Sequence, residues 1–157
     1  MLIADGFAAK ELAAVRKVLE AAGAKLELVS PRLGMISGSD GKRIEVTKNF
    51  LTTSSIFYDA VYVPGGSRSA DSLRVLEKAL DFVDEASQHF KPVGATGAGI
   101  ALLADAGLDE GAFAEPGVKK VVSVAGIVSA SAEGAESFAK AFVDAIAQHR
   151  HWDRAQP

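Results

Sequence analysis

The sequence predicts an α/β fold in which a mostly parallel sheet is covered by helices on both faces. Short apolar runs typical of buried strands alternate along the chain with segments whose apolar residues recur at helical spacing. Parallel strands need crossover connections, which usually place helices on both faces of the sheet. The length of 157 residues, with 48% hydrophobic and 24% charged residues, suits one domain with a single substantial core.

The first third of the chain contains a strand, a helix, a second strand and a hairpin. The opening "MLIADG" is a short strand that ends in a turn at Asp5-Gly6, and Gly23 stops the helix predicted over residues 7–22. The apolar stripe of this helix consists of Leu12, Val15, Leu19 and Ala22. "KLELVSP" alternates as a strand does, and "GMISGSDGKRIEV" is typical of a small hairpin that turns at Ser39-Asp40-Gly41.

The remaining elements follow the same alternation. "DAVYVPGG" is a buried-type strand that runs into a Pro-Gly-Gly loop, "KPVGAT" is the next strand, and "KKVVSVAG" is strand-like. A helix of small residues is expected from Gly97 to Ala106. Two further helical stripes consist of Leu73, Leu76, Leu80 and Val83, and of Phe138, Phe142, Ala145 and Ile146 in a terminal helix reaching roughly His149.

Charge and hydropathy exclude several classes of partner. The net charge of −3 leaves no basic stripe, so nucleic acid is not expected as a partner. No apolar run approaches the length needed to span a bilayer, so no membrane partner is expected. The pattern of a signal peptide is also missing, because a charged residue arrives by Asp5, and the cytoplasm is the default compartment.

The chain contains no cysteine, which excludes disulfides, thiolate metal sites and a thiol nucleophile. The "HRHW" stretch carries His149 and His151 at the end of the last predicted helix, where cations suit the helix dipole. We interpret it as a solvated helix end, and we expect no metal site and no cofactor bound by this chain.

Functional sites in such folds lie beyond the carboxyl ends of the parallel strands. Three strand ends meet that condition: Asp5-Gly6, Pro64–Ser67 and Thr96–Gly99. The backbone amides of Gly65, Gly66 and Gly97 could hold a small anion there. The glycine spacing in "GATGAG" does not match a dinucleotide-binding or P-loop motif, so a nucleotide is not expected.

The stretch "KPVGATGAGIALL" has the shape of a strand-to-helix elbow that could hold a nucleophile. Thr96 supplies its hydroxyl, but no histidine lies near it in the sequence to act as a base. Glu11 lies in the first turns of the first helix, where a carboxylate complements the helix dipole. A role in a pocket is the alternative for Glu11, because that helix begins at the carboxyl end of a strand.

These residues resemble the flavodoxin-like core of the class I glutamine amidotransferase-like superfamily, which includes intracellular protease I and the parkinsonism-associated deglycases. The core of that superfamily is a three-layer α/β/α sandwich. The elbow of that superfamily reads roughly A-x-x-C-x-G, and its cysteine position falls on Gly97 of "GATGAG". The acidic partner of the cysteine falls on Glu11, and the Pro-Gly-Gly loop that helps to line the pocket falls on Pro64–Gly66. The resemblance therefore implies a vestigial pocket around Glu11, Thr96 and Gly97 that lacks its reactive atom.

A closer resemblance covers nearly the whole chain. "SPRLGMISGSDGKRIEV", "DAVYVPGG", "FKPVGATGAG" and "QHRHWDR" are similar to the C-terminal domain of large-subunit monofunctional heme catalases, a group in which that domain typically lacks the cysteine. The resemblance implies one domain over residues 1–157, excised from the C-terminus of a catalase. It also implies a role in the stability and assembly of a parent enzyme that decomposes hydrogen peroxide.

That resemblance also sets expectations about partners and cofactors. The partners would be the catalase core of the same chain and neighbouring subunits, and chaperone activity in the superfamily adds unfolded client proteins. Heme would belong to the parent enzyme alone, because neither Tyr58 nor Tyr62 lies in the R-x-x-x-Y pattern of a heme ligand. Two other functions stay open: an enzyme of the hydrolase, deglycase or amidotransferase kind that uses Glu11 and Thr96, and a module that binds a small anion.

Overall fold

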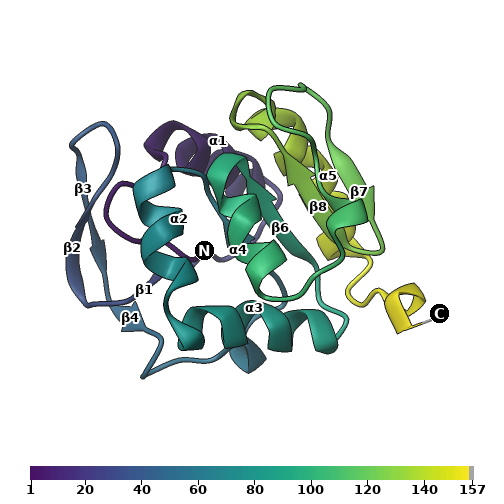
Figure 1. Cartoon of the computed structure of the whole chain (residues 1–157), viewed down its shortest axis with the longest axis horizontal. Coiled ribbons are helices and arrows are strands. Elements are labelled where there is room, and N and C mark those ends of the chain that lie inside the picture. Colours follow the sequence, from purple (N-terminus) through teal and green to yellow (C-terminus); the bar gives the residue numbers. More distant parts are fainter. Residues whose placement is uncertain (156–157) are drawn as a thin grey trace.

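The computed structural model describes residues 1–155 and contains a central, mostly parallel sheet (Figure 1). Its strands stand in the order β5-β6-β8-β7. The strands β5 (Val61–Val63), β6 (Val93–Thr96) and β8 (Ile127–Ala130) are parallel. The edge strand β7 (Val122–Val124) pairs with β8 in the antiparallel sense. The mostly parallel sheet predicted from the sequence is confirmed.

The amino-terminal residues extend this sheet toward a second pair of strands. β1 (Val29–Ser30) pairs in parallel with β4 (Lys48–Asn49). Leu2 forms a parallel bridge to Val29, and its amide also donates to the Tyr62 carbonyl over 2.9 Å. The opening residues therefore lie between β1 and β5, which is the place that a strand would take.

A hairpin formed by β2 (Gly34–Ser37) and β3 (Arg43–Val46) stands at the left of the molecule in Figure 1. Its strands are antiparallel and place Ile36 opposite Ile44, so the hairpin predicted from the sequence is confirmed.

Helices cover both faces of the sheet. On one face, α1 (Ala9–Ala21) and α5 (Ala135–Ala147) pack together over a core that includes Tyr62 and Phe138. On the other face lie α2 (Ser67–Arg74), α3 (Glu77–Gln88) and α4 (Ile100–Asp105). Alternate residues of β5 and β8 point into these two cores, as the pleat of a strand requires. The predicted three-layer sandwich is confirmed.

Short 3₁₀ turns complete the chain at Ser55–Phe57, Gly97–Gly99, Glu110–Ala112, Ala132–Gly134 and Trp152–Ala155. No helix among residues 1–155 is long and apolar enough to cross a membrane.

The structure differs from the sequence prediction in two places. The stripe from Leu73 to Val83 belongs to two helices, because Leu76 caps α3 with extended backbone (φ −104°, ψ 110°) and the chain turns there. Both helices bury their apolar residues in the same core, so apolar spacing alone does not reveal the turn. The strand β8 was not predicted. All four of its residues are buried, and a fully buried strand lacks the alternation of apolar and polar residues that reveals a strand in the sequence.

Candidate functional site

The three strand ends named from the sequence meet at one edge of the sheet. The Ala8 amide at the start of α1 donates to the Gly65 carbonyl over 2.8 Å. The Glu11 carboxylate reaches from α1 to the Gly65 amide, which follows β5, and to Thr96, the last residue of β6. Residues far apart in the sequence therefore form one cluster, as expected for the carboxyl ends of parallel strands.

Glu11 is the centre of this cluster and is only 8% exposed. Its Oε2 atom accepts a hydrogen bond from the Gly65 amide over 3.0 Å and a short hydrogen bond from the Thr96 hydroxyl. A buried carboxylate requires such donors, because desolvation without partners costs several kcal/mol. Glu11 thus joins α1 to the ends of two strands. Its role is therefore larger than a favourable interaction with the helix dipole.

Thr96 is fully buried, and its hydroxyl is occupied on both sides. The Thr96 Oγ1 atom lies 2.8 Å from the Tyr62 hydroxyl. Since Thr96 donates to Glu11, the Tyr62 hydroxyl donates to Thr96, and the three side chains form a chain of hydrogen bonds. Burial raises the pKa of Tyr62, which keeps the phenol protonated as a donor. A hydroxyl committed in this way faces no substrate, and this geometry disfavours Thr96 as a nucleophile.

Gly97 occupies the corner of the elbow in a left-handed conformation, with φ at +52°. This left-handed region is where the nucleophile of a strand-to-helix elbow is held, and glycine enters it at little cost. A Cβ atom built on Gly97 would lie 3.3 Å from Glu11 Oε1 and 3.4 Å from Ala132 Cβ. The backbone at this corner would place a side chain beside the Glu11 carboxylate, but Gly97 has no side chain.

The same carboxylate affects binding of an anion at the backbone amides. The Gly65 amide is already used by Glu11, and a Cβ on Gly65 would lie 2.6 Å from Glu11 Oε1. An anion held by the amides of Gly65 and Gly97 would sit against this carboxylate, where an ionised Glu11 would repel it. The arrangement disfavours the small-anion module.

A groove of about 540 Å³ opens beside the elbow. It is lined mainly by apolar residues of the Gly97 loop, of the start of α4 and of the segment 114–117. Ser131 also lines it, is 7% exposed, and has an Oγ atom without a hydrogen-bond partner among the described residues. Ser131 could not be predicted from the sequence, because one serine after an unpredicted strand has no recognisable pattern.

The tyrosines and histidines do not form a second reactive site. The Tyr58 hydroxyl donates to Glu27 Oε2 over 2.6 Å, so neither tyrosine of the chain offers its oxygen to a heme iron, and the residues present do not fit heme. Within residues 1–155, no group of three or more His, Cys, Asp or Glu side chains is placed to hold a metal ion.

The interpretation of "HRHW" as a solvated helix end is wrong for His151. His149 is exposed, whereas His151 is 4% exposed and its Nε2 atom donates to the Ala145 carbonyl over 2.9 Å. The chain folds back after α5, which the sequence pattern of a helix end does not reveal.

The family follows from comparison with known proteins. The model of the DJ-1/PfpI family matches residues 1–145. The chain belongs to the DJ-1/PfpI family. Solved structures agree on the fold: Schizosaccharomyces pombe DJ-1 superposes with a TM-score of 0.75 at 17% identity, covering 94% of this chain and 95% of that one. The DJ-1/ThiJ/PfpI-like and ferritin-like two-domain protein of Anabaena variabilis gives a TM-score of 0.84 at 20% identity, covering 93% of this chain and 48% of that one.

Within this family, the chain is similar to a segment of large catalases. It is 38% identical over 156 residues to Catalase-2 of Bacillus subtilis and 37% identical over 155 residues to Catalase HPII of Mycobacterium avium. These matches cover 98% of this chain, which spans only 20% and 22% of the two catalases. The resemblance to a catalase domain of the DJ-1/PfpI kind, predicted from the sequence, is confirmed.

One relative is of similar length. A deglycase of Pyrococcus abyssi is 30% identical over 135 residues, which cover 85% of this chain and 81% of that protein.

Proposed function

We propose that this chain is a non-catalytic domain of a large-subunit heme catalase and that it supports the stability and assembly of that enzyme. The observation that carries the proposal is the match of 98% of the chain, at 38% identity, to one fifth of Catalase-2 of Bacillus subtilis. Its partners are the catalase core of the same polypeptide and neighbouring subunits. Heme and the decomposition of hydrogen peroxide belong to that core.

The geometry of the elbow supports the non-catalytic part of the proposal. Chemistry of the nucleophilic kind requires an activated side chain within reach of the substrate. The corner residue Gly97 has no side chain, the chain has no cysteine, and the Thr96 hydroxyl is buried between Tyr62 and Glu11. We expect no esterase, peptidase or methylglyoxal-converting activity above background. Activity that disappears in Glu11→Gln and Thr96→Val would contradict this expectation.

The parentage is tested first on the gene. We expect a catalase core to be encoded in frame with residues 1–157. A gene that encodes no such core in frame would refute the proposal.

The supporting role is tested on the full-length protein. We expect removal of residues 1–157 to shorten the half-life of catalase activity at elevated temperature at least fivefold and to reduce the assembled fraction in analytical ultracentrifugation. Equal half-lives with and without the domain would contradict a supporting role.

A second candidate function is chaperone-like protection of unfolded proteins. Exposed apolar side chains at Leu51, Ile56 and Phe57 favour it, because binding of unfolded chains requires an accessible apolar surface. The chain would then slow the aggregation of a heat-denatured client in a light-scattering assay. No suppression at an equimolar ratio would refute this function.

A further inference from the structure

A short segment between β4 and β5 presents three large apolar side chains to solvent. Leu51 is 82% exposed, Ile56 is 69% exposed and Phe57 is 76% exposed. We call these three residues the 51–57 surface. Single exposed apolar residues are ordinary, whereas three within seven residues indicate a surface that is covered in the functional protein.

The backbone beneath the 51–57 surface is held by polar contacts, one of them from a buried lysine. Lys91, which is 4% exposed, donates from Nζ to the Ser55 carbonyl over 2.8 Å. The Ser55 hydroxyl donates to Glu85 Oε2 over 3.2 Å, and Ser54 Oγ accepts from the Ile56 amide over 3.3 Å. A buried lysine amine needs its hydrogen-bond partner, because an unpaired buried charge is costly, so the contact holds the Ser55 carbonyl in place.

Both ends of the segment are fixed as well. At its start, the Asn49 side chain accepts hydrogen bonds from the amides of Leu51 and Thr52, both over 3.0 Å. At its end, Tyr58 donates to Glu27 Oε2 over 2.6 Å. A loop ordered before binding loses little conformational entropy when a partner docks. The 51–57 surface is therefore a preorganised apolar contact.

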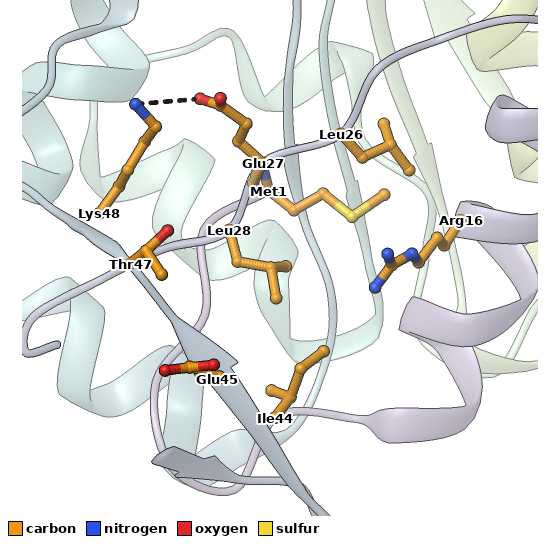
Figure 2. A pocket seen from close by; sticks show the side chains of 9 residues that line it. All are labelled: Met1, Arg16, Leu26, Glu27, Leu28, Ile44, Glu45, Thr47 and Lys48. Carbon is orange, nitrogen blue, oxygen red and sulfur yellow. Dashed lines mark hydrogen bonds and ion pairs between the residues drawn. The ribbon is translucent and has the colours of Figure 1, made fainter. Parts of the chain in front are cut away.

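The first residue of the chain lies beside this surface. Met1 and Phe57 line the same hollow, which has a volume of about 490 Å³. Met1 also lines a second hollow of about 390 Å³ together with Leu26, Leu28 and Ile44 (Figure 2). Residues that precede Met1 in a longer polypeptide would enter the domain next to Phe57.

We propose that the 51–57 surface is the docking contact for the catalase core of the same polypeptide. This inference rests on the proposed function, in which about four fifths of the protein lies outside the domain, since the chain spans 20% of Catalase-2 of Bacillus subtilis. A core connected at Met1 is held at high effective concentration next to Phe57, so a modest apolar contact suffices for stable docking. The matching surface on the core is mainly apolar, because the large exposed side chains at this contact are those of Leu51, Ile56 and Phe57.

The test uses the full-length protein and the chain 1–157 side by side. Hydrogen exchange of the segment 50–58 is measured in both, and we expect at least tenfold slower exchange in the full-length protein. The full-length double variant Leu51→Ser/Phe57→Ser is expected to lose this protection and to release the domain at least fivefold faster under limited proteolysis. Val124→Ser, a 48% exposed residue on the opposite edge of the sheet from β4, is the matched control and leaves both measurements unchanged.

Each other outcome overturns the inference in a recognisable way. Protection in the chain 1–157 that rises with protein concentration identifies a second copy as the occupant. Protection that appears only when a denatured client is added identifies unfolded proteins. Equal exchange in both proteins refutes core docking and leaves the proposed function standing, whereas the absence of an encoded core refutes both. Thermal unfolding of the double variant of the chain 1–157 within about 2 °C of the unsubstituted chain excludes misfolding as the cause, because exposed substitutions cost little.

Discussion

Residues with positive φ lie at both ends of the strands of the central sheet, but glycine occupies one end and residues with side chains occupy the other. At the carboxyl ends of the strands, the corner of the elbow is Gly97, which adopts a φ of +52° at little cost because it has no side chain. At the amino edge, three residues with side chains, Phe90, Ala125 and His149, have φ values of 58°, 48° and 65°. Such strain costs of order 1 kcal/mol or more for each residue and persists only where the surroundings hold it.

The contacts at the amino edge explain how its strain is held. The Arg154 guanidinium donates to the carbonyls of Ala125, Ser87 and Lys91 over 2.8 to 3.1 Å. The His151 amide donates to the Phe90 carbonyl over 2.8 Å. The chain after α5 thus forms a clasp, made of residues 149–155, over the ends of α3, β6 and β8. At the elbow a glycine adopts the left-handed conformation and presents no side chain, whereas at the clasp residues with side chains adopt it and are held by hydrogen bonds.

The largest effect is expected where the clasp meets the sheet. A Cβ on Gly126, which has a φ of +77°, would lie 2.2 Å from the His151 ring. We expect Gly126→Ala to lower the free energy of unfolding by about 4 kcal/mol, because it adds an overlap to backbone strain. Chemical denaturation measures the loss.

The control for Gly126→Ala is Gly41→Ala. Gly41 has a φ of +80° with no atom within 4 Å of its Cβ position, so this variant reports strain alone, at about 1 kcal/mol. Equal losses in the two variants would show that His151 is not held against the sheet.

The next effect concerns the guanidinium of the clasp. We expect Arg154→Met to cost about 2 to 3 kcal/mol of unfolding free energy, because it leaves the carbonyls of Ser87, Lys91 and Ala125 without their charged donor. Arg150→Met is the control, since among residues 1–155 the Arg150 side chain donates only to the neighbouring His149 carbonyl. A loss of unfolding free energy in Arg154→Met no larger than that in the control would show that the guanidinium does not stabilise the strained residues at the amino ends of the strands.

The amino terminus of the chain adds a pH-dependent effect. Burial lowers the pKa of the Met1 amine to about 5 in the folded chain, against an ordinary value of 8.0. Between these values the unfolded chain binds more protons than the folded one, so stability is complete above pH 8 and falls as the pH falls. We expect a chain that begins with a free Met1 to lose about 2 kcal/mol of unfolding free energy from pH 8 to pH 6.

The amino-terminally acetylated chain isolates this effect, because it keeps the histidines and removes the amine. Denaturation curves of both forms at pH 6 and pH 8 give the difference. Identical pH dependence would show that the free amine turns outward into water and adds no cost.

The smallest effect is expected at the elbow. Gly97→Cys places a side chain at φ +52° with its Cβ in contact with Glu11 and Ala132, at 3.3 and 3.4 Å. We expect it to cost about 1 kcal/mol of unfolding free energy. The thiol faces the groove beside the elbow, so iodoacetamide should modify it in the folded chain, as mass spectrometry would detect.

Gly97→Ala has the same backbone strain without the thiol and is the matched control. A loss above about 3 kcal/mol in both variants would mean that the corner is no longer shaped to hold a side chain. A cysteine that resists alkylation in the folded state would place the side chain away from the groove.

The sequence by itself determined the alternation of strands and helices, the hairpin and the lack of a thiol. These features follow from local periodicity, turn residues and composition, which depend on neighbouring positions only. It also indicated the elbow around Gly97, because a glycine-rich turn between a strand and a helix has a recognisable local pattern.

Only the tertiary structure decided what those residues do together. The bond between Glu11 and Thr96 joins positions 85 residues apart, and local pattern does not reveal such a contact. The same holds for Arg154 and Ser87, which are 67 residues apart, and for the buried His151. Burial and hydrogen bonding across the sheet are properties of the packed chain, and they assign Thr96 to the core and "HRHW" to a clasp.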